Sequence, residues 1–225
     1  MGRPRTFDKA EVLALARDAF WAKGYEATSL DDLMRATGLG KGSLYAAFGD
    51  KHRLFLEVLE TYSAGRLERT RAALCGQGDE ESGESRAIER LHAFFRVEEP
   101  GDIADTARTA LAGRGCFLVN STTEVASHDE AVRTLARCAY GTLEDLLAAT
   151  VARAVEEGDL PATTDSRELG RLLLAVLQGM EFLAKSGMAS AEVAKIGAST
   201  RERLLGAPAA ARTARGKPAT KRTKR

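Results

Sequence analysis

The residues best suited to chemistry lie between positions 41 and 51, where lysine and hydroxyl side chains follow a glycine-rich turn. Lys41 stands at the predicted start of a helix, where the helix dipole is already positive and a cation is unfavourable. A phosphate would resolve that conflict, because the first backbone N–H groups and the lysine would both face an anion. Lys51 stands at the start of the next predicted helix, and the same argument applies to it. These residues therefore predict contact with nucleic-acid phosphates.

Two short helices, at 30–37 and 41–48, are predicted to position these side chains. Ser29 and Asp32 have the spacing of a capping box, in which a hydroxyl and a carboxylate satisfy backbone N–H groups at the helix start. The glycines after the first helix permit a sharp corner. The outward face of the second helix carries Lys41, Gly42, Ser43, Tyr45 and Ala46. Two helices on a glycine turn, the second with a small and basic outer face, are typical of a protein that enters the DNA major groove.

The same glycines do not fit a nucleotide-binding loop. The dinucleotide fingerprint needs a third glycine where Ser43 stands, and a P-loop needs Gly-Lys-Ser or Gly-Lys-Thr, whereas Gly42 follows Lys41 here. No strand is predicted before the turn either. A helical corner explains these glycines better.

Neither a metal site nor a catalytic site is expected. The histidines His52, His92 and His128 are scattered over different predicted elements, and Cys116 has no second ligand at short helical spacing. No Ser-His-Asp or paired-carboxylate arrangement stands out. We therefore expect a protein that is not an enzyme and has no cofactor.

The charge distribution separates a basic tail from an acidic body. The 225-residue chain has a net charge of +1, but residues 207–225 hold seven Lys or Arg and no acid, which leaves −6 on residues 1–206. Such asymmetry is typical of a nucleic-acid partner. We expect the tail to be disordered. It either adds non-specific DNA affinity by counterion release or only keeps the protein in solution.

Nothing in the sequence indicates a membrane or an oxidising compartment. No apolar run approaches the ~18 residues of a membrane span, and the N-terminus lacks a signal-peptide core. Three cysteines at irregular spacing predict reduced thiols rather than a disulfide framework. We expect a cytoplasmic protein.

Apolar residues recur at helical spacing through most of the chain, which predicts an all-α fold of about nine helices with no convincing strand. The segment 75–85 is polar and glycine-rich and predicts a loop. A weaker helix is predicted over 103–111, and 116–126 is predicted helical because its apolar run has no strand partner. The other predicted helices cover 8–23, 30–37, 41–48, 50–74, 86–97, 129–157, 166–185 and 189–205.

With these elements in place, the first 62 residues resemble the TetR family of bacterial transcription regulators. The residues that carry the likeness are Ala19-Phe20, Lys23-Gly24-Tyr25, Ala27-Thr28-Ser29, Asp32-Leu33, Gly38-Leu39, Lys41-Gly42-Ser43-Leu44-Tyr45, Phe48, Asp50-Lys51 and Leu54-Phe55. The resemblance implies a helix-turn-helix domain over 1–62 with its motif at 29–48. It further implies a helical effector-binding and dimerisation domain over 63–206, before the tail at 207–225.

The resemblance also implies a function. A homodimer would bind a pseudo-palindromic double-stranded DNA operator, usually as a repressor that a small-molecule effector releases. By family position, Lys41, Ser43 and Ala46 would approach base edges, and phosphates would be contacted by Thr28, Ser29, Tyr45 and Lys51. The chain departs from the family at Gly40, where a capping Ser or Thr is common, and at Ala46-Ala47, where many members have polar side chains.

Cys116 is the most reactive side chain of the predicted effector domain. It follows Gly-Arg-Gly at a predicted helix start, where the helix dipole and Arg114 would lower the pKa of its thiol. A subset of TetR proteins that senses electrophiles or oxidants has a similar Gly-Cys position, followed by an apolar run and a Glu-Val step at Glu124. The alternative is a small buried hydrophobic residue, which is what free cysteines most often are.

Polar and aromatic residues in apolar helical stripes suggest where an effector would bind. Asn120, Tyr140, Gln178 and Phe182 lie within or beside such stripes and would join Cys116 at the site, although helix-to-helix hydrogen bonds are an alternative. The wide apolar face of 166–185, together with 189–205, predicts the dimer interface, although an apolar core within one chain is an alternative.

The sequence therefore predicts a ligand-responsive DNA-binding regulator, released from its operator by a small-molecule effector or by thiol modification. An architectural DNA-binding protein without an effector is the alternative. An enzyme with an appended helix-turn-helix is disfavoured by the missing catalytic set. The effector, the operator sequence and the choice between repression and activation are not encoded in any recognisable pattern.

Overall fold

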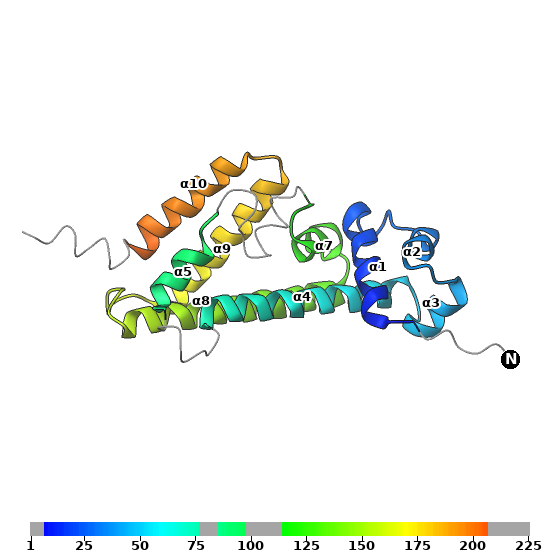
Figure 1. Ribbon diagram of the computed structural model, residues 1–225, viewed down its shortest axis with the longest axis horizontal. Coiled ribbons are helices and arrows are strands. Elements are labelled where there is room, and N and C mark those ends of the chain that lie inside the picture. The colour runs from blue at the N-terminus through cyan, green and yellow to red at the C-terminus, as the bar shows by residue number, and fades with distance from the viewer. Residues whose placement is uncertain (1–6, 77–84, 98–113, 207–225) are drawn as a thin grey trace, which may run out of the picture.

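Helices account for all the regular secondary structure in the computed structural model, whose described residues are 7–76, 85–97 and 114–206 (Figure 1). They are α1 (Lys9–Lys23), α2 (Leu30–Thr37), α3 (Lys41–Phe48), α4 (Lys51–Cys75), α5 (Ala87–Phe94), α7 (Phe117–Val125), α8 (Glu130–Glu156), α9 (Ser166–Lys185), α10 (Ser190–Thr200) and the π-helix η2 (Arg201–Leu205). The predicted all-α class is confirmed. The predicted helix at 103–111, the basic tail and most of the predicted loop at 75–85 lie outside the described residues.

Side-chain caps begin most of these helices. Asp8 accepts a hydrogen bond from the backbone of Ala10 at 2.8 Å before α1, and the predicted capping box of Ser29 and Asp32 is present before α2. Each such cap stabilises a helix by about 1 kcal/mol. Gly38 ends α2 with a φ of 69°, a left-handed conformation that glycine adopts without strain. This allows α3 to start at a sharp angle to α2.

The helices form a small head and a larger body joined by one continuous helix. In Figure 1, α1, α2 and α3 gather at one end of the long helices α4 and α8. Helices α5, α9 and α10 cover the other end of α4 and α8, and α7 lies between the head and α9. The boundary predicted between residues 62 and 63 falls inside α4, so the head and the body share that helix.

Head and body also share a hydrophobic core. Phe117 of α7 is 2% exposed and inserts between aromatic side chains of the head and α4. Its ring centroid lies 6.1 Å from that of Phe55, 5.6 Å from that of Tyr62 and 5.7 Å from that of Trp21. Offset and edge-to-face aromatic pairs add to the stability of such a cluster. A displacement of α7 must therefore disturb the head.

Among the described residues, none of the helices combines the length and the apolar content needed to cross a membrane. No group of His, Cys, Asp or Glu residues in the same part of the chain is arranged to hold a metal ion.

Candidate nucleic-acid interface and sensor site

The outward face of α3 is exposed as the sequence predicts. Lys41, Ser43, Tyr45 and Ala46 all lie on the surface, and Leu44 and Phe48 anchor the helix from beneath. Gly40 at the N-cap has no side chain to bind the first backbone N–H groups of α3. Unbonded N–H groups at a helix start attract an anion.

Both lysines of this surface lie against aromatic rings and have no carboxylate partner within the described residues. Lys41 Nζ is 5.7 Å from the ring centroid of Tyr45. Lys51 Nζ is 4.4 Å from the ring centroid of Tyr25 and donates a hydrogen bond to the Glu26 carbonyl at 3.4 Å. Ammonium groups held over rings but left without a counter-ion suit an approaching phosphate.

Thr28 does not belong to this surface, which corrects the sequence-based assignment of a phosphate contact. Its side chain is fully buried, and its hydroxyl donates to the Gly24 carbonyl at 2.5 Å. The hydroxyl therefore stabilises the turn between α1 and α2. The sequence could not separate this role from a surface one, because both use a threonine one residue before a helix cap.

Ser29 remains exposed, but its hydroxyl caps α2. It donates to Asp32 Oδ2 at 2.7 Å and accepts from the Asp32 backbone. Hydrogen bonds from Lys23 and Ser29 hold the pKa of the Asp32 carboxyl well below its usual range. The cluster fixes the start of α2, which in turn supports α3.

Glu124 of α7 holds the turn between α1 and α2 from the body side. Its carboxylate accepts hydrogen bonds from the backbone N–H groups of Tyr25 at 3.0 Å and Glu26 at 2.9 Å. Gly24 has a φ of 86°, which favours glycine, and a Cβ atom there would also lie 2.8 Å from both carboxylate oxygens and displace them. Glu124 was predicted only as part of a Glu-Val step, and its contact with the turn between α1 and α2 was not predicted from the sequence.

A second contact joins the head to the start of α8. His52 Nε2 lies 2.7 Å from Asp129 Oδ2, and the other Asp129 oxygen caps α8 by accepting from Ala131 and Val132. Burial raises the pKa of Asp129, but the hydrogen bonds from Val132, His52 and Ala131 outweigh it and lower the pKa below the ordinary value.

Cys116 lies in a buried charged cluster formed by α4, α7 and α9. The Arg66 guanidinium donates to the Cys116 sulfur and to both carboxylate oxygens of Glu181. Tyr62 donates its hydroxyl to the same sulfur at 3.6 Å. All three members of the Arg66, Glu181 and Cys116 cluster are buried. Neither Arg66 nor Glu181 was predicted from the sequence as part of this cluster.

The prediction that Arg114 and the helix dipole lower the pKa of the Cys116 thiol is wrong. Burial raises that pKa, and the negative charge of Glu181 raises it further. Arg66 lowers the pKa, but by less than the other two effects raise it. Arg114 points away, with its guanidinium 4.9 Å from the Trp21 ring centroid. In this structure the thiol is therefore a protonated, protected group.

The remaining predicted effector residues do not share one pocket with Cys116. Tyr140 is beside the cluster, where burial raises its pKa to about 12. Asn120 instead donates to the Arg114 carbonyl at 2.8 Å. Gln178 has a buried carboxamide without a hydrogen-bond partner among the described residues. Phe182 is 56% exposed on the outer face of α9, so the structure separates it from the predicted pocket.

Comparison with known proteins shows which family has this arrangement. The family model "Bacterial regulatory proteins, tetR family" matches residues 12–58, and "Tetracyclin repressor-like, C-terminal domain" matches residues 87–195. The HTH-type transcriptional repressor ComR of Escherichia coli is 30% identical over 88% of this chain and 90% of its own length. The chain belongs to the TetR family. It is a helix-turn-helix DNA-binding transcription regulator, and this family comprises regulators rather than enzymes.

Other TetR relatives and structures agree. An uncharacterised HTH-type regulator of Bacillus subtilis, YezE, is 33% identical over 82% of this chain and 90% of its own length. The TetR family regulator CifR, a cysteine mutant solved with a 26-bp double-strand operator DNA, is 29% identical. The comparison covers 89% of this chain and 99% of that one, with a TM-score of 0.71.

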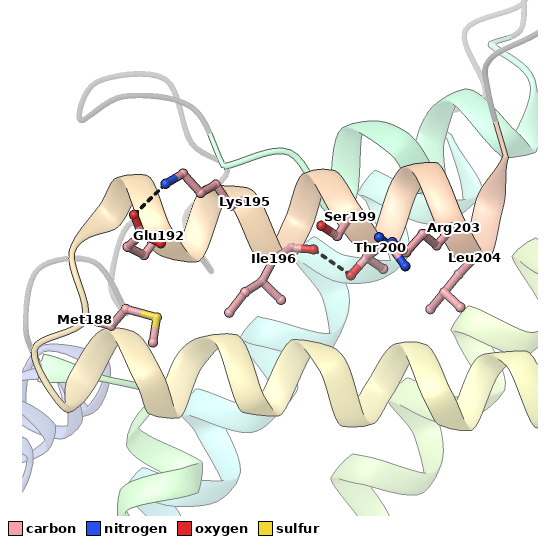
Figure 2. A pocket seen from close by; sticks show the side chains of 8 residues that line it. All are labelled: Met188, Glu192, Lys195, Ile196, Ser199, Thr200, Arg203 and Leu204. Atoms are coloured by element: carbon pink, nitrogen blue, oxygen red, sulfur yellow. Dashed lines mark hydrogen bonds and ion pairs between the residues drawn. The ribbon is translucent and has the colours of Figure 1, made fainter.

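The body also has an exposed apolar surface of a kind that isolated monomers seldom have. Leu172, Ala175, Gly179 and Phe182 recur three and four residues apart on the outside of α9, and Leu172 is 45% exposed. A Cβ atom at Gly179 would meet nothing within 4 Å, so no other part of the described chain covers this stripe. Met188 of the turn between α9 and α10, Ile196 of α10 and Leu204 of η2 point toward α9 and line a groove of about 500 Å³ (Figure 2).

Proposed function

We propose that this protein is a homodimeric repressor that binds a pseudo-palindromic operator through α3 and leaves it when an effector or a thiol-modifying compound acts on the body. The observation that carries the DNA part is the exposed face of α3, with an uncapped start and two nearby lysines that have no counter-ion in the part of the chain that the structure describes. Such a protein acts where DNA is, in the bacterial cytoplasm.

Each side chain of the interface has a proposed role. Lys41 and Ser43 contact base edges, while Ala46 offers a methyl group to thymine methyls. Gly42 lets the DNA backbone or a base edge come close, since it adds no side chain. Ser29, Tyr45 and Lys51 contact phosphates and set the register. Thr28 is not assigned a contact. Because few of these side chains can discriminate bases, DNA shape must contribute to specificity.

The outer stripe of α9 and the groove beside α10 form the proposed dimer interface, within residues 166–205. A contiguous exposed apolar surface is typical of an oligomer contact, and small residues at Ala175 and Gly179 permit close approach of two helices. A dimer places two α3 helices in successive major grooves, about 34 Å apart. The proposed domains are then 1–62 for DNA binding and 63–206 for sensing and dimerisation, with α4 passing through both.

Cys116 is the proposed point of thiol modification. Because its thiol is buried and its pKa is raised, a reagent reaches it only when the start of α7 opens locally. Its sulfur can add to the β-carbon of an α,β-unsaturated carbonyl compound, with the thiol proton ending on the α-carbon. The adduct would occupy the space beside Arg66 and separate it from Glu181. Because Phe117 follows directly and packs against Phe55, displacement of the start of α7 would reach the head. Release then follows if the two α3 helices no longer match the groove spacing.

Operator release tests this proposal. DNA flanking the gene is labelled, and the bound fraction is measured by fluorescence anisotropy with a panel of quinones, enals and hypochlorite. We expect release in the wild type and in Cys138→Ser, an exposed cysteine on α8 that serves as the matched control. Cys116→Ser should remain bound. Release that persists in Cys116→Ser contradicts the thiol mechanism, and release by non-electrophilic compounds alone supports an ordinary effector instead.

A further inference from the structure

A cavity of about 490 Å³ lies at the junction of α1 and α7, and Cys116 is not among the residues that line it. Its size is within the range of small-molecule sites. Aromatic side chains of Trp21 and Phe117 form part of its wall, with polar groups from Asn120 and Thr123 beside them. We call it the junction cavity. Neither the proposed DNA contacts nor the thiol chemistry uses it.

The junction cavity is cationic. The charged side chains that line it are Lys23, Arg114, Lys185 and Glu124. Glu124 already accepts two backbone N–H groups, and Lys23 forms an ion pair with Asp32 at 2.6 Å. Of the other two cations, Lys185 has no carboxylate partner among the described residues, and Arg114 has only a long ion pair with Asp18 and a hydrogen bond to the Asp18 carbonyl at 3.3 Å.

The contacts of these two cations show that they are positioned but not neutralised. Lys185 Nζ donates to the neutral amide oxygen of Asn120 at 2.7 Å. Arg114 approaches the Asp18 carboxylate only to 3.8 Å, at a solvent-exposed position where such a pair contributes little. The Arg114 carbonyl accepts from Trp21 Nε1 at 3.1 Å and from Asn120, which fixes this residue at the edge of the cavity.

We propose that the junction cavity binds a small carboxylate with an aromatic body. The carboxylate would lie between Arg114 and Lys185, since a guanidinium and an ammonium both favour this anion. The aromatic body would pack against Trp21 and Phe117, where flat rings make extensive contact. The inference goes beyond the proposed function, because it concerns binding that can be measured without DNA and without any change at Cys116.

The chain contains its own reporter for this test, because Trp21 is its single tryptophan. Benzoate is titrated into the full chain while Trp21 emission is followed, with calorimetry as a second readout of the same titration. Benzamide, which has the same shape without the charge, is the matched ligand. We expect saturable binding of benzoate at least tenfold tighter than that of benzamide, weakening as salt is raised.

Variants locate the site. Arg114→Gln and Lys185→Gln should each weaken benzoate binding at least fivefold, whereas Arg71→Gln, an exposed arginine on α4 outside the cavity, should not change it. No benzoate binding by either readout, equal binding of benzamide, or unchanged affinity in both cavity variants would overturn the inference. Operator release by an electrophile without benzoate binding would overturn it while leaving the proposed function intact.

Discussion

Arg66 of α4 and Glu181 of α9 form an ion pair inside the protein, with side chains only 7% and 4% exposed. Charged residues are rarely buried to this degree unless they are paired. The same guanidinium contacts the sulfur of Cys116, the proposed sensor. The pair therefore connects α4, which passes from the head into the body, to α9 of the proposed dimer interface. Removing either charge must therefore change both stability and thiol chemistry.

Glu181→Gln should lower stability and make Cys116 more acidic. Loss of one member of a buried pair typically costs about 3–5 kcal/mol of unfolding free energy, measured here by urea denaturation. The thiol pKa should fall because the negative charge of Glu181, which disfavours a thiolate, is gone, so alkylation by iodoacetamide should accelerate at neutral pH. Glu68→Gln, which changes an exposed carboxylate on α4, is the control and should change neither property. An unaltered alkylation rate in folded Glu181→Gln would show that Glu181 does not restrain the thiol.

Lys51→Ala should weaken binding to all DNA sequences alike. The lysine would contact a phosphate, so its loss removes one released counterion and reduces the slope of log affinity against log salt by about one. Arg71→Ala, on the part of α4 in the body, should leave the slope unchanged. A salt slope equal to that of the wild type would mean that Lys51 makes no phosphate contact.

Thr28→Val should affect folding rather than DNA contact. The hydroxyl is buried and bonded to the Gly24 carbonyl, so its loss should lower the unfolding free energy by about 1 kcal/mol. The salt dependence of DNA binding should stay that of the wild type. If the slope instead falls as it does in Lys51→Ala, Thr28 reaches a phosphate after rearrangement of the turn.

Phe182→Glu should prevent dimerisation. The ring is 56% exposed on the outer stripe of α9, and a carboxylate there would be buried without a partner in the proposed interface. Sedimentation should show a monomer that keeps the helical spectrum of the wild type. Leu15→Glu, which changes an exposed leucine on α1, should remain dimeric. A dimeric Phe182→Glu would place the interface elsewhere.

Asp129 should make stability depend on pH in the acid range. Its folded pKa lies below the ordinary value, so its charge stabilises the native state above that value and the contribution is lost as pH falls through the folded pKa. The difference in unfolding free energy between wild type and Asp129→Asn should be constant from about pH 7 to 5 and shrink below about pH 4. A difference that persists unchanged at low pH would assign the effect to helix capping geometry, which asparagine retains.

The sequence was informative where local rules decide the structure. Ser29 and Asp32 are a capping box because their spacing is fixed by the helix, and Gly38 marks a corner because few residues adopt its conformation. The exposed face of α3 was also predicted, because the apolar residues of that segment recur at helical spacing. The resemblance to the TetR family was carried by residues between positions 19 and 55.

Contacts between distant helices could not be predicted in the same way. Arg66 stands four residues after Tyr62, and Glu181 four after Leu177, so both fall on apolar stripes where a charge signals a buried partner. Helical periodicity indicates that such a charge has a buried partner, but it does not identify the partner. The assumption that Arg114 serves Cys116 used nearness in sequence, whereas the guanidinium that reaches the thiol comes from a different helix.

Footprinting on the DNA flanking the gene tests the central claim most directly, namely that α3 of a dimer recognises an operator. The account predicts a protected pseudo-palindromic site whose two halves are one helical turn, about 34 Å, or a multiple of it apart. The footprint should disappear in the Lys41→Ala and Lys51→Ala double variant and persist in Arg71→Ala. Uniform binding along the fragment with no protected site would contradict the account and indicate an architectural DNA-binding protein.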